Sequence, residues 1–441
     1  MTFHDETVDV LGIGFGPSNM ALAIALEEYN SRAHDEDKIN AIFFEKQESS
    51  AWHPHMLFED ASMQVAFAKD LVTFRNPQSK YSFLSFLVAH DRIVDFFNRG
   101  SMLPLRTEFS HYLQWAAQQL NHFVSYASTV TKIEPTYSAH STVNGYQVTV
   151  QNQGKTRIYY AQHVVLAAGV QPVYPTQVQP TEHVWHTADF LKNIKEISAP
   201  ATQEFAVVGG GQSAAEAVIY LHNAYPEARI HCIHSAYGYI ASDMTPYANK
   251  IFDPEAVNDF FYAPEEKRLA LLDKHISTNY SCVNADTIEQ IFEMEYVDRC
   301  VGRTRLIWHK ASSVREIREE NGRVHVDVLN HLTDQENTIT VDVAVCGTGY
   351  KAFDASALLG DHSWLVQRDR DGKPHINRDY SAVLTVSGDA KLFLIGQTHH
   401  THGMSSTLLS NIAVRAGEIV DSLLAHRTAH QQAQDILEVA Q

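Results

Sequence analysis

Residues 8–19 read VDVLGIGFGPSN, and the chain continues as MALAIAL to residue 26. The apolar run before Gly12 predicts a strand, the glycines predict a tight turn, and the run after Pro17 predicts a helix. Such a turn lets backbone N–H groups approach a pyrophosphate, whose charge the helix N-terminus stabilises. Pro17 stands where the motif usually has its last glycine, a mild departure because proline suits the first turn of a helix. The residues expected to bind a dinucleotide here are Gly12, Gly14, Gly16 and Pro17.

A second strand is expected at residues 41–44 (AIFF), and Glu45 follows it directly. An acidic residue at this place typically bonds a ribose hydroxyl of the dinucleotide, so Glu45 joins the predicted cofactor-binding residues.

The strand, turn and helix pattern returns at residues 205–217 as FAVVGGGQSAAEA. Gly209 and Gly211 form this second turn, and Ala214 takes the third slot, which the motif permits. Two such units in one chain imply a flavin and a nicotinamide cofactor. The glycine-ended runs at residues 167–169 and 347–349 fit the crossings between the two units.

We therefore expect an α/β fold with two Rossmann-like dinucleotide-binding domains, the second inserted in the first. The FAD-binding domain is predicted to comprise residues 1–175 and 346–441, with a C-terminal helix from about Ser405 to Ala425. The NADPH-binding domain is predicted at residues 176–345, with a small, mostly helical substrate region at about 245–300.

The composition is that of a globular enzyme, since 44% of the 441 residues are apolar. The 34 basic and 52 acidic residues give a net charge of −18, which argues against nucleic-acid binding. The four cysteines lie far apart, which disfavours a disulfide framework or a zinc site. No signal-peptide pattern and no bilayer-spanning run is found, so a cytoplasmic protein without stable membrane association is expected. A homo-oligomer, either a dimer or a tetramer, is also expected.

A series of further motifs follows the first glycine turn along most of the chain. They are Trp52-His53, Met63-Gln64-Val65, Lys69-Asp70-Leu71-Val72-Thr73, Arg75-Asn76-Pro77, Pro104-Leu105-Arg106, Thr278-Asn279-Tyr280-Ser281, Gly347-Thr348-Gly349-Tyr350 and His402-Gly403-Met404-Ser405. Taken together and in this order, these motifs resemble the flavin-dependent N-hydroxylating monooxygenases of siderophore biosynthesis. Members of that family hydroxylate the side-chain amine of ornithine or lysine, or a diamine.

The resemblance implies that NADPH reduces FAD, that O₂ adds to the flavin as a hydroperoxide, and that a neutral primary amine attacks its distal oxygen. NADP⁺ stays bound and shields the hydroperoxide. The protein must exclude water and align the amine, so neither a side-chain nucleophile nor a metal is expected.

The resemblance also implies roles for individual residues. Trp52, His53 and Gln64 are expected near the flavin ring, and Lys69 is expected to pair with a substrate carboxylate. Asn249 and Asn279 resemble amides that hold the substrate and the cofactor ribose, and Ser410 resembles a serine near both. The remaining residues predicted to bind a cofactor are Gln212, Ser213, Ser235 and Gly349.

Several departures from the family pattern bear on the substrate and on the nicotinamide cofactor. Ala68 replaces a bulky apolar residue beside Lys69, and His234-Ser235 stands where many relatives have an arginine for the 2′-phosphate. Neutral His and Ser give a phosphate no fixed counter-charge. The turn at residues 398–402 is rich in histidine and is interpreted as a polar wall near the flavin. L-Ornithine is the family default, with putrescine, cadaverine or histamine as alternatives and L-lysine behind them.

Other functions fit the chain less well. A disulfide reductase needs a redox cysteine pair near the flavin, and the chain has none. A sulfur or ketone monooxygenase carries a Phe-x-Gly-x-x-x-His fingerprint, of which residues 183–190 retain only the histidine. A flavin-binding scaffold without activity would not need so many pocket residues.

Overall fold

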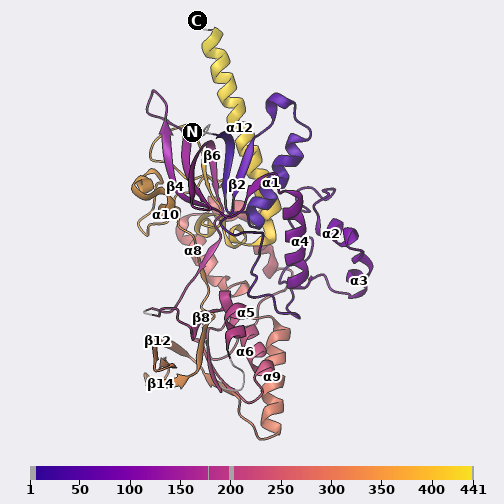
Figure 1. Cartoon of the computed structure of the whole chain (residues 1–441), viewed down its shortest axis with the longest axis vertical. Helices are drawn as coiled ribbons and strands as arrows, with labels where there is room; N and C mark the ends of the chain where they lie inside the picture. Colours follow the sequence, from indigo (N-terminus) through magenta and orange to yellow (C-terminus); the bar gives the residue numbers. More distant parts are fainter. Residues whose placement is uncertain (1–5, 177, 198–202, 440–441) are drawn as a thin grey trace.

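Two mainly parallel sheets organise the chain, one in each half of an elongated molecule (Figure 1). The computed structural model describes residues 6–176, 178–197 and 203–439. The predicted α/β class is confirmed, because parallel strands in both halves alternate with helices.

The first sheet places the first glycine turn at its carboxyl edge. Its strand order is β3-β2-β1-β6-β5-β4, and β1 is parallel to both β2 and β6. The carboxyl ends of β1 and β2 therefore lie side by side, which brings Glu45 next to the turn after β1. The strands are β1 (Glu6–Ile13), β2 (Ala41–Phe44), β3 (Val124–Ser125), β4 (Ser128–Tyr137), β5 (Val143–Asn152) and β6 (Lys155–Leu166).

On the edge away from β1, strand β6 pairs with two different strands along its length. Residues 155–161 pair with β5 in antiparallel fashion, whereas Val164–Leu166 pair in parallel with β17 (Leu392–Leu394). The sheet is thus completed by a strand from the far end of the chain.

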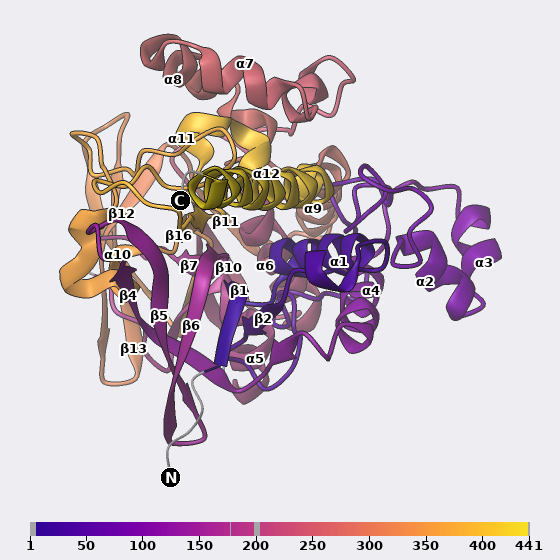
Figure 2. The same ribbon diagram turned by 90° about the horizontal axis from the view of Figure 1, so that it is seen from above.

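Helices α1 (Pro17–Asn30) and α12 (Ile412–Val439) contact each other over the first sheet (Figure 2). Alanine and leucine side chains of α1 are fully buried against Ile412, Ala416 and Ile419 of α12. This core also includes α4 (Arg106–Gln119) and side chains of α2 (Phe83–Ala89) and α3 (Ile93–Asn98).

The predicted C-terminal helix, from about Ser405 to Ala425, is wrong at both ends, since α12 spans Ile412–Val439. The helix begins at Ile412, and the residues before it form two 3₁₀ turns, η7 (Met404–Thr407) and η8 (Leu409–Asn411). Side chains here bond the backbone instead: Arg415 donates to the Ser406 carbonyl, and Asn411 Nδ2 donates to the Phe252 carbonyl at 3.1 Å. Such bonds compete with helical ones.

The second sheet has the order β11-β10-β9-β15-β8, with all strands parallel. A three-stranded antiparallel sheet packs beside it, and helices α5 (Phe190–Asn193), α6 (Gln212–Ala224) and α9 (Ala285–Cys300) accompany it. The parallel strands are β8 (Val184–His186), β9 (Glu204–Val208), β10 (Arg229–Ile233), β11 (Leu306–His309) and β15 (Val343–Cys346). The antiparallel ones are β12 (Ser312–Glu320), β13 (Arg323–Asn330) and β14 (Glu336–Val341).

The two crossings between the sheets lie side by side. Strand β7 (Val170–Pro172) leaves the first sheet and pairs in antiparallel fashion with β16 (Tyr350–Ala352), which returns from the second. Helix α10 (Ser356–Leu359) follows β16 and contacts β4.

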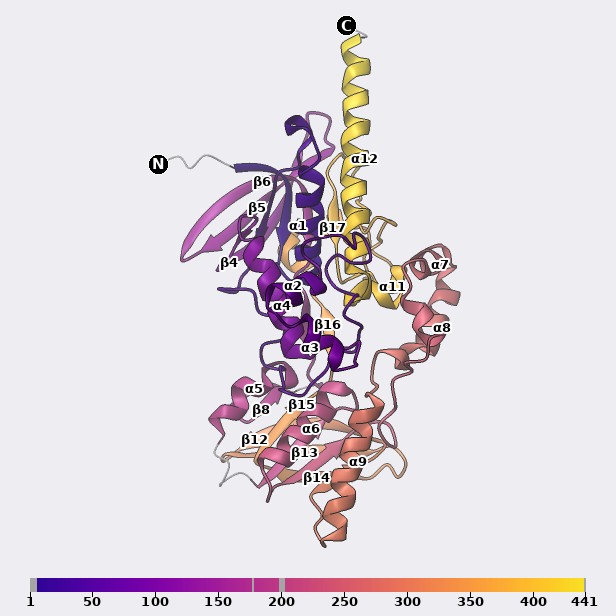
Figure 3. The same ribbon diagram turned by 90° about the vertical axis from the view of Figure 1, so that its right-hand side faces the viewer.

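The region expected to be helical, residues 245–300, divides into two parts. Helices α7 (Ala256–Tyr262) and α8 (Glu265–Lys274) lie against α11 (His399–His402), whereas α9 packs on α6 of the second sheet (Figure 3). Among the described residues, no helix combines the length and the apolar character needed to cross a bilayer.

Candidate active site

A cavity of about 980 Å³ opens at the carboxyl ends of β1 and β2 and extends to the segment that precedes α9. This volume lies at the upper end of the usual range for ligand pockets. The predicted site residues that line it are Gly14, Gly16, Pro17, Glu45, Trp52, His53, Gln64, Lys69, Asn249, Asn279 and Ser410.

The first glycine turn is shaped by three different constraints. Gly14 has φ +82°, and a Cβ there would lie 2.5 Å from the Ala167 carbonyl oxygen. A Cβ at Gly12 would overlap the Phe43 ring, so this glycine makes room for a core side chain rather than for a ligand. Gly16 has open space around it, which is what the close approach of a pyrophosphate requires.

Glu45 holds the turn in place. Its carboxylate accepts the Phe15 N–H at 2.9 Å and the Gln47 N–H at 2.9 Å. An amide of α1 assists, since Asn19 Nδ2 donates to the Gly14 carbonyl at 2.7 Å. The turn, the open space at Gly16 and the α1 N-terminus at Pro17 together fit the pyrophosphate of FAD.

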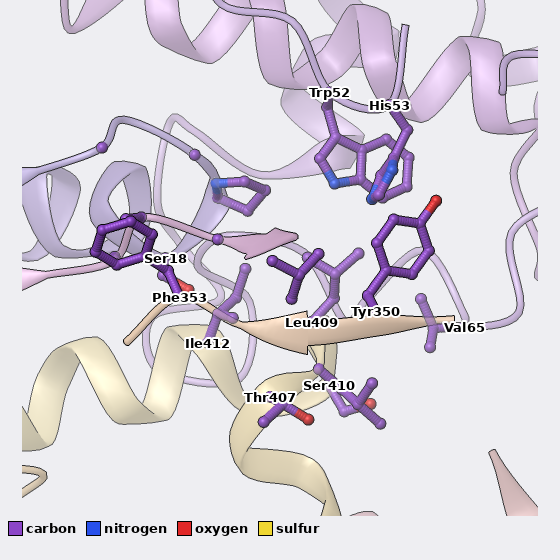
Figure 4. Close-up of a pocket in the computed structure, with 18 of the residues that line it drawn as sticks. Ser18, Trp52, His53, Val65, Tyr350, Phe353, Thr407, Leu409, Ser410 and Ile412 are labelled. Carbon is purple, nitrogen blue, oxygen red and sulfur yellow. The ribbon is translucent and has the colours of Figure 1, made fainter. Parts of the chain in front are cut away.

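Aromatic rings form one side of the cavity (Figure 4). The rings of Trp52 and His53 lie 4.7 Å apart, and Tyr350 of β16 faces the same space. Burial and the nearby Arg106 lower the pKa of His53 to about 4, so this imidazole is neutral at physiological pH.

Lys69 reaches the cavity without a carboxylate partner among the described residues. Its Nζ lies 5.7 Å from the centre of the Phe252 ring. Burial lowers the pKa of Lys69, and the charge of Asp253 opposes this shift. The side chain is therefore able to receive an anion from a ligand.

The polar residues expected around the substrate come from separate segments. Asn249 Nδ2 donates to the Thr245 carbonyl at 3.0 Å, and Asn279 follows the short turn η5 (Ile276–Thr278). On the opposite side, Ser410 and Thr407 lie just before α12, and Thr407 Oγ1 is 2.8 Å from the Tyr280 hydroxyl (Figure 4).

A polar chain links the two halves of the molecule beside the cavity. Arg106 forms a two-pronged ion pair with Glu216 of α6 at 2.7 and 2.8 Å. Gln212 donates to Glu216 at 3.0 Å and accepts the Asn284 N–H at 2.8 Å, and Gln64 donates to Asn284 Oδ1 at 3.1 Å. The side chains of Gln64 and Gln212, both predicted to touch cofactors, thus also bond the protein.

The second glycine turn lies outside this cavity. Gly209 has φ +132°, and a Cβ there would lie 2.2 Å from the Gly347 carbonyl oxygen. Gly211 and Ser213 lie at the start of α6, Ser235 is exposed after β10, and Gly349 precedes β16 with φ +83°. These predicted residues therefore group around a second site and one crossing, not around the cavity.

The cavity has lining residues that received no role from the sequence. Arg106 and Tyr350 belong to motifs that carried the resemblance, so their positions in those motifs were a usable signal. Others carry no sequence signal; they include Phe353, Ile412 and Ser242.

The histidine-rich turn does not line this cavity. His399 and His400 line a smaller one of about 470 Å³, and His402 is fully buried with Nε2 3.1 Å from the Arg378 carbonyl. The interpretation of this turn as a wall near the flavin is not supported by these positions.

Known proteins share both the sequence and the fold. The sequence pattern of the L-lysine 6-monooxygenase/L-ornithine 5-monooxygenase family matches residues 6–352. The chain belongs to this family. It is 34% identical to an L-ornithine N(5)-oxygenase of Arthrobotrys oligospora, over 95% of this chain and 88% of that protein. It is 32% identical to an L-ornithine N(5)-monooxygenase of Pseudomonas aeruginosa, over 95% of this chain and 94% of that one.

A solved structure of a family member shows the same architecture. The ornithine N-hydroxylase of Kutzneria sp. 744, with reduced FAD, NADP⁺ and L-ornithine, aligns with a TM-score of 0.91 and 41% identity. The alignment covers 96% of this chain and all of that one. The predicted family, fold class, enzyme class and cofactors, FAD and NADPH, are thereby confirmed.

Proposed function

We propose that the enzyme hydroxylates the side-chain amine of L-ornithine, using O₂, NADPH and FAD. The observation that carries the substrate is Lys69, a half-buried cation in the cavity that forms no ion pair with a described carboxylate. An amino-acid carboxylate would supply that charge. The relatives named for ornithine support the same choice.

FAD reduced by NADPH supplies an activated oxygen atom, and the chain's own residues bind and orient the amine. Gly14, Gly16 and the α1 N-terminus hold the pyrophosphate of FAD, and Glu45 fixes the turn and reaches its ribose. Trp52, neutral His53 and Tyr350 exclude water from the reacting end of the cavity. Lys69 fixes the carboxylate end of ornithine, while Asn249, Asn279 and Ser410 bond its remaining polar groups.

A carboxylate-free amine is the second candidate, because burial lowers the pKa of Lys69 and Ala68 leaves room beside it. A neutral Lys69 would tolerate putrescine, cadaverine or histamine.

The deciding experiment measures hydroxylamine product from ornithine, lysine, putrescine, cadaverine and histamine. NADPH oxidation alone is not sufficient, because NADPH is also consumed when the enzyme releases hydrogen peroxide without hydroxylating the amine. We expect ornithine to give the most product. Lys69→Ala should raise KM for ornithine about ten-fold or more, since a charged hydrogen bond is lost. Putrescine, which lacks a carboxylate, should show no such rise.

Lys192→Ala, in the exposed part of α5, provides a charge-matched control and should change neither KM. Product from carboxylate-free amines only would replace ornithine by the second candidate. No product from any of the five amines would refute N-hydroxylation.

We further propose that residues 1–175 and 346–441 bind FAD and residues 176–345 bind NADPH, in a cytoplasmic homo-oligomer. Support for the assembly comes from an exposed apolar stripe formed by Phe292, Tyr296 and Val297 of α9 and by Val301, which directly follows the helix. A single-chain mass by light scattering would contradict this assembly.

A further inference from the structure

The segment after β10 contains no Lys or Arg that could recognise the 2′-phosphate of NADPH. In a dinucleotide-binding unit this strand end faces the adenosine ribose, where an acidic residue selects NAD and a basic one accommodates the 2′-phosphate of NADP. Residues 234–240 read HSAYGYI, with neither a carboxylate nor a Lys or Arg. The charge for a 2′-phosphate must therefore come from another segment.

The second glycine turn directly contacts this strand end. Gly209 N–H donates to the Ile233 carbonyl at 2.8 Å, and a Cβ at Gly210 would lie 3.3 Å from the Cβ of His234. A pyrophosphate at the α6 N-terminus thus places the attached ribose beside residues 234–235.

His234 itself does not provide the charge. The residue is only 3% exposed, its ring stacks on Tyr239, and its Nδ1 lies 2.8 Å from the Ala236 carbonyl. Burial lowers its pKa, so the ring is neutral, and its Nε2 has no partner among the described residues.

The segment after β11 runs alongside the one after β10. Ala311 N–H donates to the Ala236 carbonyl at 2.9 Å, and Ser312 N–H donates to the His234 carbonyl at 3.0 Å. These bonds fix Lys310 beside residues 234–237, although it lies some 75 positions further along the chain.

Lys310 is held there with its charge free. Its Nζ lies 4.6 Å from the centre of the Tyr237 ring, and no described carboxylate forms an ion pair with it. The Lys310 carbonyl is anchored by Ser312 Oγ at 2.8 Å and Asn330 Nδ2 at 3.2 Å. An aromatic ring orients a cation without neutralising it.

We propose that Lys310 recognises the 2′-phosphate of NADPH, with the Ser235 hydroxyl as a second donor. Lys310 thus supplies, from the segment after the neighbouring strand β11, the positive charge that the segment after β10 lacks. This inference rests on the use of NADPH and is independent of which amine is hydroxylated.

The test measures dissociation constants of NADP⁺ and NAD⁺ for the FAD-loaded enzyme by isothermal titration calorimetry. Lys310→Ala should weaken NADP⁺ binding about ten-fold, which corresponds to about 1.4 kcal/mol, and leave NAD⁺ binding unchanged. Lys192→Ala removes the same charge at the opposite edge of the same sheet and should change neither constant.

A rescue distinguishes recognition from a loss of folding. Ser235→Arg in the Lys310→Ala background should restore tight NADP⁺ binding, because it returns a cation to the same place. Equal NADP⁺ affinities for wild type and Lys310→Ala would overturn the proposal, as would equal weakening of NAD⁺ and NADP⁺. If the wild type instead prefers NAD⁺, it is NADPH use, and not only the role of Lys310, that is wrong.

Discussion

At the scale of single residues, the three glycines of the first turn show that one residue type can have a different role at each position of a motif. The sequence predicted three glycines for pyrophosphate binding. In the structure, Gly12 makes room for the Phe43 ring, Gly14 permits a tight backbone contact, and Gly16 leaves an open space where a ligand fits. A motif reports which residue types are needed, but the reason for each depends on atoms from distant strands.

Gly14→Val should abolish flavin binding. A valine at φ +82° is strained by about 1–3 kcal/mol, and its Cβ would collide with the Ala167 carbonyl oxygen. Flavin absorbance per protein and the melting temperature should both fall. Gly16→Ala, with no protein atom in its way, should keep the melting temperature of the FAD-free protein and lose flavin alone. Full flavin content in Gly14→Val would disprove this role.

At the scale of elements, the connection between Arg106 and α6 explains how the two sheets keep their alignment. The ion pair with Glu216 is mostly buried, with side-chain exposures of 13% and 10%. It joins the start of α4 to α6, the helix whose N-terminus we propose binds the second cofactor. Since hydride transfer requires the two cofactors to meet in one geometry, we expect this ion pair to have a function besides stability.

Glu216→Ala should lower the free energy of unfolding by about 3 kcal/mol, because the Arg106 charge loses its buried partner. It should also slow flavin reduction by NADPH about ten-fold, measured by stopped-flow absorbance. Glu28→Ala is the matched control: it breaks a similarly buried ion pair with Arg75, within the first half of the chain. That variant should lose stability but keep its reduction rate. An unchanged reduction rate in Glu216→Ala would contradict the alignment role.

Elements with a regular pattern were predictable from the sequence, and elements shaped by distant contacts were not. The strand at residues 41–44 and the helix after Pro17 appear as predicted, because apolar periodicity and turn residues specify them locally. The start of α12 was wrong because Arg415 and Asn411 bond backbone groups that the sequence alone does not bring near. Likewise, the position of Lys310 beside Tyr237 follows from strand pairing, which has no local signature.

At the scale of the whole molecule, buried histidines should make stability depend on pH. Burial lowers the pKa of His53 to about 4, and of His163 and His402 to about 3. Unfolded histidine binds a proton near pH 6.5, whereas the folded groups stay neutral, so acid favours the unfolded chain. Each group should reduce the free energy of unfolding by about 2 kcal/mol between pH 7.5 and 5.

Denaturant unfolding of the FAD-loaded enzyme between pH 7.5 and 5 measures this slope. His163→Gln should make this pH dependence of the free energy of unfolding smaller, because an amide does not bind a proton in this pH range. The glutamine amide oxygen can still accept the Lys391 backbone N–H, which His163 Nδ1 accepts at 3.1 Å. An identical slope in this variant would exclude His163 as a source.

The pairing of β6 with β17 also sets an order of events on the ribosome. All strands of the second sheet have been synthesised by residue 346, whereas the first sheet waits for residues 392–394. Until then Val164–Leu166 present an unpaired apolar edge on the nascent chain. The inserted half can therefore fold first. A chain interrupted before residue 391 would contain one complete sheet and one incomplete sheet, whose exposed apolar edge is the kind of surface that chaperones bind.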